Sequence, residues 1–252
     1  MGVEVILLGT VHLDLEARDC LLKLLSALEP ECITVEISPF SVSFRALHQR
    51  TWEQLLRKGV RQLPAQNRGH ARIRLLRRQI KFPFEWSAAR EYAKKRGISC
   101  LAIDSEELAK RDLPVWEDEL LSPDNLYRLV QTQNFDLETH FKRCYRYAER
   151  VLDTPGDILP QIHPLSWLSE PFWKRREQML AERIRQISVG YRRVVHIGGW
   201  MHIVTGGPWK TVADFLYDLG PVRFLANPVL FLNREMHGIS CHIPKQPASE
   251  YV

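Results

Sequence analysis

Short apolar runs alternate with amphipathic stretches along the chain, and this pattern predicts an α/β fold. Four apolar runs are long enough for a buried strand and too short for a helix. They cover residues 3–8, 32–36, 98–103 and 193–197. Between the first two runs, leucines at helical spacing predict a helix that begins at Asp14 and that Pro30 ends. This order is that of a βαβ unit with parallel strands. We therefore expect a central, mostly parallel sheet flanked by helices on both faces.

The remainder of the chain is predicted to be mainly helical. The expected helices cover residues 41–63 with an interruption near Gly59, 70–81, 85–96, 136–152, 169–188 and 206–219. Two stretches, at about 40–84 and 106–168, are interpreted as helical insertions into one α/β domain that spans residues 1–252. Because the first insertion leaves the sheet directly after Glu36, we expect the insertions to cover the C-terminal edge of the sheet.

Two of the predicted strands end in the same pattern, Gly-x-x-His. Gly9 precedes His12 after the first strand, and Gly199 precedes His202 after the last. Glu36 stands at the tip of the second strand. In open α/β sheets the C-terminal ends of the strands form the edge where ligands bind. Two imidazoles and a carboxylate suit zinc, manganese, cobalt or iron, and they leave positions open for water. The sequence therefore predicts a divalent metal site formed by the two histidines and Glu36.

These motifs resemble those of a known family. The segments LLGTVH, LEPECITVEIS and VVHIGGWMH are similar to the TraB/PrgY–TIKI–GumN family, which is related to erythromycin esterase and ChaN-like proteins. The resemblance continues at REYAKKRGISCLAID and RREQMLAERI. It covers residues 1–38, 85–105 and 170–205, and it leaves both predicted insertions uncovered.

The resemblance implies a metal-dependent hydrolase of peptidase or esterase type, because the TIKI branch of the family implies a metal-dependent peptidase. It makes Glu36, Asp104 and Arg176 candidate catalytic residues. Asp104 could accept a proton, although an aspartate at a strand tip is also a common helix N-cap. Arg176 could hold an oxyanion or a substrate carboxylate by two parallel hydrogen bonds. The chain departs from the family at Glu177, where a shorter acid or amide is usual.

A non-catalytic interpretation stays open at this point. The two motif histidines could form only hydrogen bonds in a cleft at the sheet edge, with Glu36 neutralising an arginine such as Arg176. The chain would then be a binding or regulatory module for a small anion, a peptide or haem. His163 lies in a predicted loop and is a weaker candidate for the site. His196 is expected to pack inside its strand.

Composition narrows the class of protein. A hydrophobic content of 45% is a globular value and argues against general disorder. No apolar run reaches the roughly 18 residues of a membrane span, and no basic segment precedes the first strand. We therefore expect no transmembrane segment and no signal peptide, and a cytoplasmic location. The five cysteines form no Cys-x-x-Cys pair, and we expect free thiols rather than disulfides.

The net charge of +5 is unevenly distributed. Residues 45–81 carry eleven Lys and Arg side chains against one acid, Glu53. From His70 onward the basic residues share a helical pattern with apolar ones, which favours a solvated basic face over the site or an anion-binding lid. Nucleic-acid binding would need a wider basic footprint, so we expect none. The expected partner is a small-molecule or peptide substrate, and the sequence leaves a homodimer open.

Overall fold

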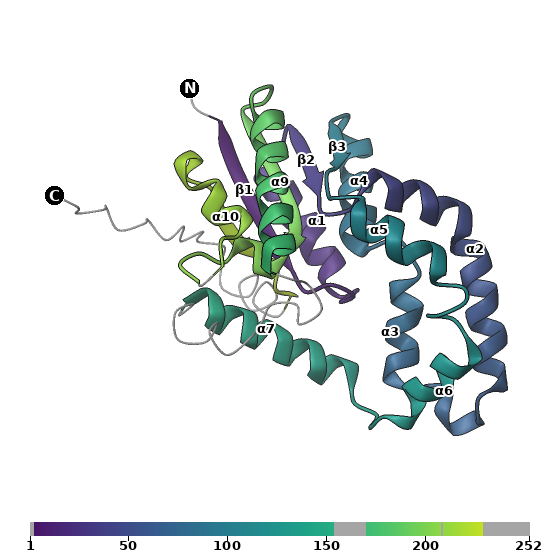
Figure 1. Cartoon of the computed structure of the whole chain (residues 1–252). Helices are drawn as coiled ribbons and strands as arrows, with labels where there is room; N and C mark the ends of the chain where they lie inside the picture. Colours follow the sequence, from purple (N-terminus) through teal and green to yellow (C-terminus); the bar gives the residue numbers. More distant parts are fainter. Residues whose placement is uncertain (1–2, 154–169, 208, 229–252) are drawn as a thin grey trace.

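The computed structural model describes residues 3–153, 170–207 and 209–228 of the chain. In this part, five parallel strands form one sheet in the order β3-β2-β4-β1-β5 (Figure 1). The strands are β1 Glu4–Thr10, β2 Cys32–Val35, β3 Ser99–Ala102, β4 Arg193–Gly199 and β5 Val222–Leu225. The predicted α/β class with a parallel sheet is confirmed, and β5, which lies in a short strand predicted at 222–226, forms the edge beside β1.

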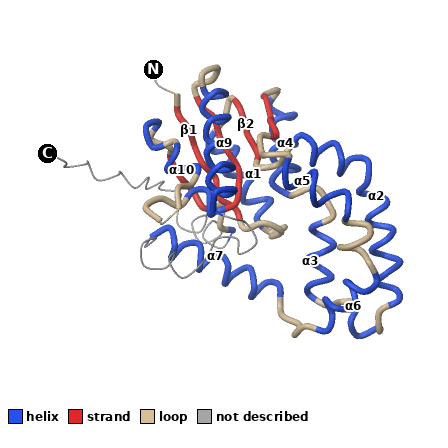
Figure 2. The backbone as a smooth tube through the Cα atoms, viewed as in Figure 1, coloured by secondary structure: helices blue, strands red, loops and turns tan. Residues whose placement is uncertain are grey.

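Helices flank the sheet and continue away from it (Figure 2). The α-helices are α1 Ala17–Leu28, α2 Pro39–Gln62, α3 Ala71–Gln79, α4 Phe84–Arg96, α5 Glu107–Asp112, α6 Pro123–Gln131, α7 Leu137–Asp153, α9 Glu170–Ser188 and α10 Val212–Phe215. Short 3-10 turns are η1 Ala65–Asn67, η2 Leu113–Val115, η4 Trp200–Ile203 and η5 Tyr217–Leu219. Each helix of the described ranges is too short or too polar to cross a membrane.

Different helices cover the two faces of the sheet. Successive side chains of a strand point to opposite faces. In β1, Ile6 and Leu8 therefore pack with α1 and α4, whereas Val5 and Leu7 pack with α9 and α10. All four side chains are buried, so β1 is an inner strand with both faces covered. In Figure 1, α9 crosses in front of the strands and α1 lies behind them.

The first predicted insertion and the first part of the second build one helical unit beside the sheet, at the lower right of Figure 1. Helices α2, α3 and α6 share a hydrophobic cluster that includes Trp52, Leu56 and Leu126. Ser38 caps α2 and Ser122 caps α6, each by accepting a hydrogen bond from a backbone N–H of the first turn. The unit therefore has a core of its own and joins the sheet close to the tip of β2.

Two predicted features of the helices are wrong. Helix α1 begins at Ala17 rather than at Asp14, because residues 13–16 form a turn in which Leu13 has φ 67°. Helix α2 runs through Gly59 without interruption. A Cβ atom on Gly59 would lie 2.4 Å from Cδ1 of Leu126, so this glycine permits close packing of two helices rather than a break.

The helix predicted over residues 206–219 is also wrong. Gly206 has φ 72°, a left-handed conformation that does not start a right-handed helix. Helix α10 instead begins after Thr211, whose side chain forms a reciprocal capping box with Asp214, and it ends at Phe215. The predicted loop with His163 lies outside the described residues.

Candidate functional site

The C-terminal ends of three neighbouring strands bring the two Gly-x-x-His motifs and Glu36 to one place. Strands β1 and β4 are adjacent and in register, with Thr10 opposite Gly199, and β2 lies on the other side of β4. A cavity of about 430 Å³ opens at this edge of the sheet. Its lining includes His12, Glu36, Arg176 and His202.

The glycine of each motif makes room for the other motif. A Cβ atom on Gly9 would lie 2.9 Å from Cα of Trp200, which follows the second motif glycine. A Cβ atom on Gly199 would lie 2.7 Å from Nε2 of His12. Real Cβ contacts do not come so close, so Gly9 is needed for the approach of the Trp200 backbone, and a Cβ at Gly199 would displace the His12 ring. The paired pattern in the sequence thus reflects one shared packing site.

The carboxylate of Glu36 lies between the two motif histidines. Its Oε2 accepts a hydrogen bond from the backbone N–H of Gly199 at 2.6 Å and is 3.7 Å from Nε2 of His12. Its Oε1 is 2.9 Å from Nε2 of His202 and is ion-paired with Nη2 of Arg176. The Glu36 side chain is 8% exposed. Each of its oxygens therefore faces one histidine.

A second carboxylate holds the far side of each histidine ring. Nδ1 of His12 is 2.8 Å from Oε1 of Glu85, which comes from the first turn of α4 and also accepts a hydrogen bond from Thr10. Nδ1 of His202 is hydrogen-bonded to Oε2 of Glu177 on α9, at 2.8 Å. Both glutamates are buried. A carboxylate on Nδ1 fixes the orientation of an imidazole and leaves Nε2 to face the site.

The charges in the cavity determine which groups are protonated. Burial alone would lower the pKa of His202, but the carboxylates of Glu177 and Glu36 outweigh it and raise this pKa to about 10. Burial alone would raise the pKa of Glu36, but His202, Arg176 and His12 hold it well below its usual range. The His12 pKa is also raised, because Glu85 and Glu36 outweigh desolvation. At neutral pH, His202 and Glu36 therefore form an ion pair.

Asp104 joins the site through Arg176. The guanidinium donates from Nε to Oδ1 of Asp104 at 2.9 Å and from Nη2 to Oδ2 at 2.7 Å. Asp104 also accepts the backbone N–H of Ser105 at 2.7 Å. Desolvation lowers the pKa of Arg176, but the Asp104 and Glu36 charges outweigh it and raise this pKa well above its usual value. Arg176 is thus a permanent cation between two carboxylates.

The arrangement is not that of a finished metal site. Within the described residues, no group of three or more His, Cys, Asp or Glu side chains is placed to hold a metal ion. The contact between Nε2 of His202 and Glu36 is a hydrogen bond that contains a proton, and His12 stands farther away, at 3.7 Å. A metal ion could take this position only if it replaced the proton on Nε2 of His202.

His196 lies directly under the site and is packed, as expected. It is 1% exposed, and its Nδ1 is 2.9 Å from Oγ1 of Thr34 on the neighbouring strand. Burial lowers its pKa to about 3, so the ring is neutral at physiological pH. A Cβ atom on Gly198 would lie 3.2 Å from its Nε2. The ring therefore supports the floor of the site instead of facing the cavity.

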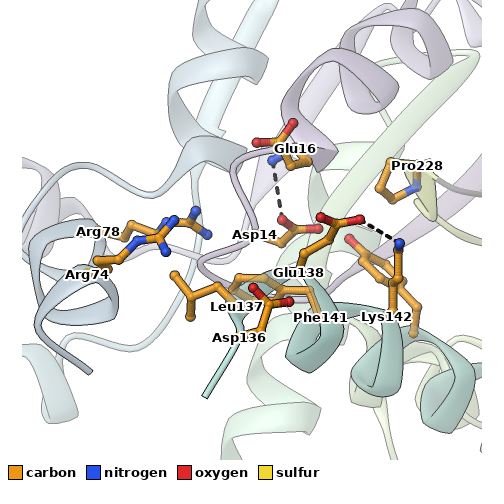
Figure 3. A pocket seen from close by; sticks show the side chains of 11 residues that line it. Asp14, Glu16, Arg74, Arg78, Asp136, Leu137, Glu138, Phe141, Lys142 and Pro228 are labelled. Carbon is orange, nitrogen blue, oxygen red and sulfur yellow. Dashed lines mark hydrogen bonds and ion pairs between the residues drawn. The ribbon is translucent and has the colours of Figure 1, made fainter. Parts of the chain in front are cut away.

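A larger cavity, of about 670 Å³, lies beside the turn that follows His12 (Figure 3). Arg78 of α3 reaches across it and donates from Nη1 to the carbonyl oxygen of Leu13 at 2.7 Å. The same guanidinium lies over the ring of Phe141, and Asp14 is buried in the cavity wall. Because a leucine at φ 67° is strained, the turn needs such support. The first insertion thereby helps to aim His12.

The basic segment 45–81 contributes little to the walls of the 430 Å³ cavity. Of the residues 45–81, Gln79 at the end of α3 is the one that lines this cavity. Arg72, Arg74 and Arg77 are exposed. A solvated basic face, one of the two interpretations of this segment, requires this. Most buried apolar residues of the segment, such as Trp52 and Ile73, pack in the helical unit of α2, α3 and α6.

Three side chains of the site were not found by sequence reasoning. The sequence pattern marks Glu85 only as the start of a helix, and it marks Glu177 only as a departure from the family pattern. Trp173 stacks on the ring of His202, with ring centres 5.4 Å apart and an angle of 9° between the planes. A glutamate directly after Pro83-Phe84 in a first helical turn carries no signal of its own. Once Arg176 is placed at the site, the helical spacing predicts that Glu177 and Trp173 lie near it.

Comparisons of the chain with protein-family models, with curated proteins and with solved structures find no match.

Proposed function

We propose that the chain is a metal-dependent hydrolase of amide or ester bonds, with His12, Glu36 and His202 as the ligands of a divalent metal ion. One observation carries the proposal: both histidines have Nδ1 bound to a buried glutamate and Nε2 turned towards opposite oxygens of Glu36. Carboxylate, imidazole and metal commonly form such a chain. A purely structural histidine does not need it, and here it occurs twice.

The donor set fits a divalent ion. Ligand bonds of roughly 2.0–2.2 Å place neighbouring donor atoms about 3–3.5 Å apart. The distances from Glu36 to the two Nε2 atoms, 2.9 Å and 3.7 Å, are close to that range. Loss of the proton on Nε2 of His202 would leave that imidazole neutral, as metal ligation requires. The protonated Nδ1 would stay bound to Glu177.

The ion would supply a Lewis acid and lower the pKa of water towards neutrality. The residues of this chain would do the rest. Arg176 would bind the developing negative charge of the substrate carbonyl, since it is a fixed cation that lines the cavity. Asp104 would hold Arg176 in place through its two hydrogen bonds. Glu85 and Glu177 would keep the two rings in their orientation.

The motif resemblance to the TraB/PrgY–TIKI–GumN family supports the same proposal, and membership of that family is part of it. The family pattern predicts two histidines and a glutamate at one edge of the sheet. In this chain the same residues line one cavity. The substrate is proposed to be a small molecule or a peptide, since the cavity measures about 430 Å³.

The test is a hydrolysis screen with peptides, esters and lactones, run with manganese, cobalt or zinc and repeated with a chelator. We expect activity that the chelator abolishes and metal restores. Glu36→Gln should lower the rate more than tenfold, because it removes charge next to the ion and preserves shape. Glu182→Gln, an exposed change on the same helix as Arg176, is the control and should leave the rate unchanged.

One observation favours a second candidate, a binding module without chemistry. Both oxygens of Glu36 already have partners in Gly199, His202 and Arg176, and such a closed network is stable without an ion. In this case the purified protein would contain no metal, and a peptide or haem would bind at His12 and His202. Absence of metal together with such binding would replace the hydrolase proposal.

A further inference from the structure

Arg45 of α2 is a buried cation with neutral partners. The residue is 6% exposed. Its Nε donates to Oγ of Ser41 at 3.1 Å, and its Nη1 donates to the carbonyl oxygens of Gln79 at 2.9 Å and Lys81 at 2.8 Å. Its guanidinium lies 4.8 Å from the ring centre of Trp116. Among the described residues, none accepts a hydrogen bond from Nη2, and no carboxylate lies within ion-pair distance of Arg45.

A buried charge without a counter-charge is costly, and proteins seldom keep one without a reason. Desolvation lowers the pKa of Arg45 to about 10, which leaves it charged at neutral pH. Three bonds to neutral oxygens position the guanidinium at the end of α3, but they do not neutralise it. The described residues therefore supply no counter-charge to this guanidinium.

Arg45 lines a cavity of about 260 Å³ that adjoins the proposed active site. Glu36, Gln79 and Leu108 line both this cavity and the 430 Å³ cavity around the motif histidines. In Figure 1 the N-terminal end of α2 and helix α5 lie together below the tips of β2 and β3. A molecule in the larger cavity can thus extend a side group past Gln79 towards Arg45.

The acidic groups of the smaller cavity already have cationic partners other than Arg45. Asp104 and Glu36 are both paired with Arg176. Asp112 is paired with its neighbour Arg111, at 2.6 Å. These carboxylates therefore do not provide the counter-charge of Arg45. A single free cation remains among the ionisable groups that line this cavity in the described part of the chain.

We propose that Arg45 binds an anionic group of the substrate, a carboxylate or a phosphate, in this side cavity. Nη2 donates to the anion, the amide of Gln79 lies beside the path between the two cavities, and Trp116 forms the apolar wall behind the guanidinium. The identification of the bound molecule as a substrate rests on the proposed function. The anion site narrows the substrate class to amides or esters that carry a negatively charged group.

Direct binding to the metal-free full-length protein tests this proposal without any need for catalysis. The probes are N-acetylglycine, its neutral analogue N-acetylglycinamide, and inorganic phosphate, each titrated by calorimetry in the presence of a chelator. We expect N-acetylglycine to bind at least tenfold more tightly than N-acetylglycinamide. Phosphate decides which anion the cavity prefers. Equal affinity for the acid and the amide would overturn the proposal, and this comparison requires no variant.

Variants locate the binding. Arg45→Gln removes the charge but keeps a donor for the carbonyl oxygens at the end of α3, and we expect at least a tenfold loss of affinity for the preferred anion. Arg45→Lys should restore part of the loss. Arg50→Gln, an exposed change on the same helix, should bind like the wild type. Wild-type affinity in Arg45→Gln would contradict the proposal. These binding experiments contain no metal, so they test the anion site alone. The hydrolase proposal is tested separately, by metal content and by activity that a chelator abolishes.

Discussion

A Cβ atom on Gly199 would lie 2.7 Å from Nε2 of His12. The second motif thus limits where the histidine of the first can stand. Gly199→Ala should push the His12 ring away from Glu36 and weaken metal binding by about ten- to a hundredfold, the usual effect of a disturbed ligand orientation. Since the ring can move into the cavity, the fold should remain intact. Competition with a chromogenic chelator measures the affinity.

Gly69→Ala is the matched control for this substitution. Nothing lies within 4 Å of a Cβ atom at that position, so metal affinity should not change. If Gly199→Ala binds metal as tightly as the control does, the close approach of the two motifs has no role in the site.

The two buried glutamates behind the histidines should matter for metal binding although they would not touch the ion. Glu85→Gln and Glu177→Gln keep the shape of the side chain and remove the charge that orients His12 and His202. Each should lower metal affinity by about ten- to a hundredfold. Glu91→Gln, an exposed change on α4, provides the comparison. If Glu85→Gln and Glu177→Gln both bind metal with an affinity within twofold of the wild type, the proposed role of the two glutamates is refuted.

Arg78 should stabilise the turn that carries His12. Its hydrogen bond to the carbonyl oxygen of Leu13 is lost in Arg78→Ala, which should reduce the free energy of unfolding by about 1–2 kcal/mol. It should also weaken metal binding. Arg77→Ala, one position away and exposed, should do neither. Denaturant unfolding and metal titration of the two variants check this, and equal behaviour of both would show that the turn stands without Arg78.

The metal-free protein should lose stability as the pH rises above neutrality. The folded pKa of His202 is about 10 and its ordinary value is 6.5, so its stabilisation is complete below pH 6.5 and is lost as the pH approaches 10. Between pH 7.5 and 9 the folded state holds one more proton than the unfolded state, and the free energy of unfolding should fall by about 1.4 kcal/mol per pH unit. His12, whose pKa is also raised, acts in the same direction.

Below pH 6.5 the pH dependence of stability has the opposite sign, and the free energy of unfolding falls as the pH falls. His196 has its pKa lowered to about 3, so the unfolded state takes up a proton there that the folded state does not. The depressed pKa of Glu36 adds a loss of stability under acidic conditions. Stability should therefore peak near pH 6.5. Urea unfolding across this pH range is the measurement, and His202→Gln should flatten the alkaline limb. A free energy of unfolding that rises from pH 7 to pH 9 would contradict the assigned ion pair.

Much of the fold could be read from the sequence because its strands are short, apolar and bounded by clear signals. The predicted ranges 32–36 and 98–103 contain β2 and β3. The Gly97 stop of α4 has the expected left-handed conformation, with φ 67°. What failed depended on the tertiary structure. The break assigned to Gly59 ignored Leu126, which lies 67 residues later in the chain and needs the space that the glycine leaves.

The candidate site was only partly predictable for the same reason. His12, Glu36 and His202 follow strand ends, so the topology of a parallel sheet places them together. Glu85 enters because α4 packs against the same face as α1, a relation between elements that no local pattern contains. Arg45 is similar: in the sequence it is one of eleven basic residues in 45–81, and burial alone distinguishes it from the others that are exposed.

Metal content tests the central claim most directly. The full-length protein is purified without a metal-affinity tag and dialysed with manganese, cobalt or zinc. Bound metal is then measured by elemental mass spectrometry. The account predicts one divalent ion per chain in the wild type and in His140→Ala, a histidine of α7 that does not line the cavity. His12→Ala and His202→Ala should remain folded and contain none. Stoichiometric metal in both of these variants, or its absence from the wild type, would contradict the account.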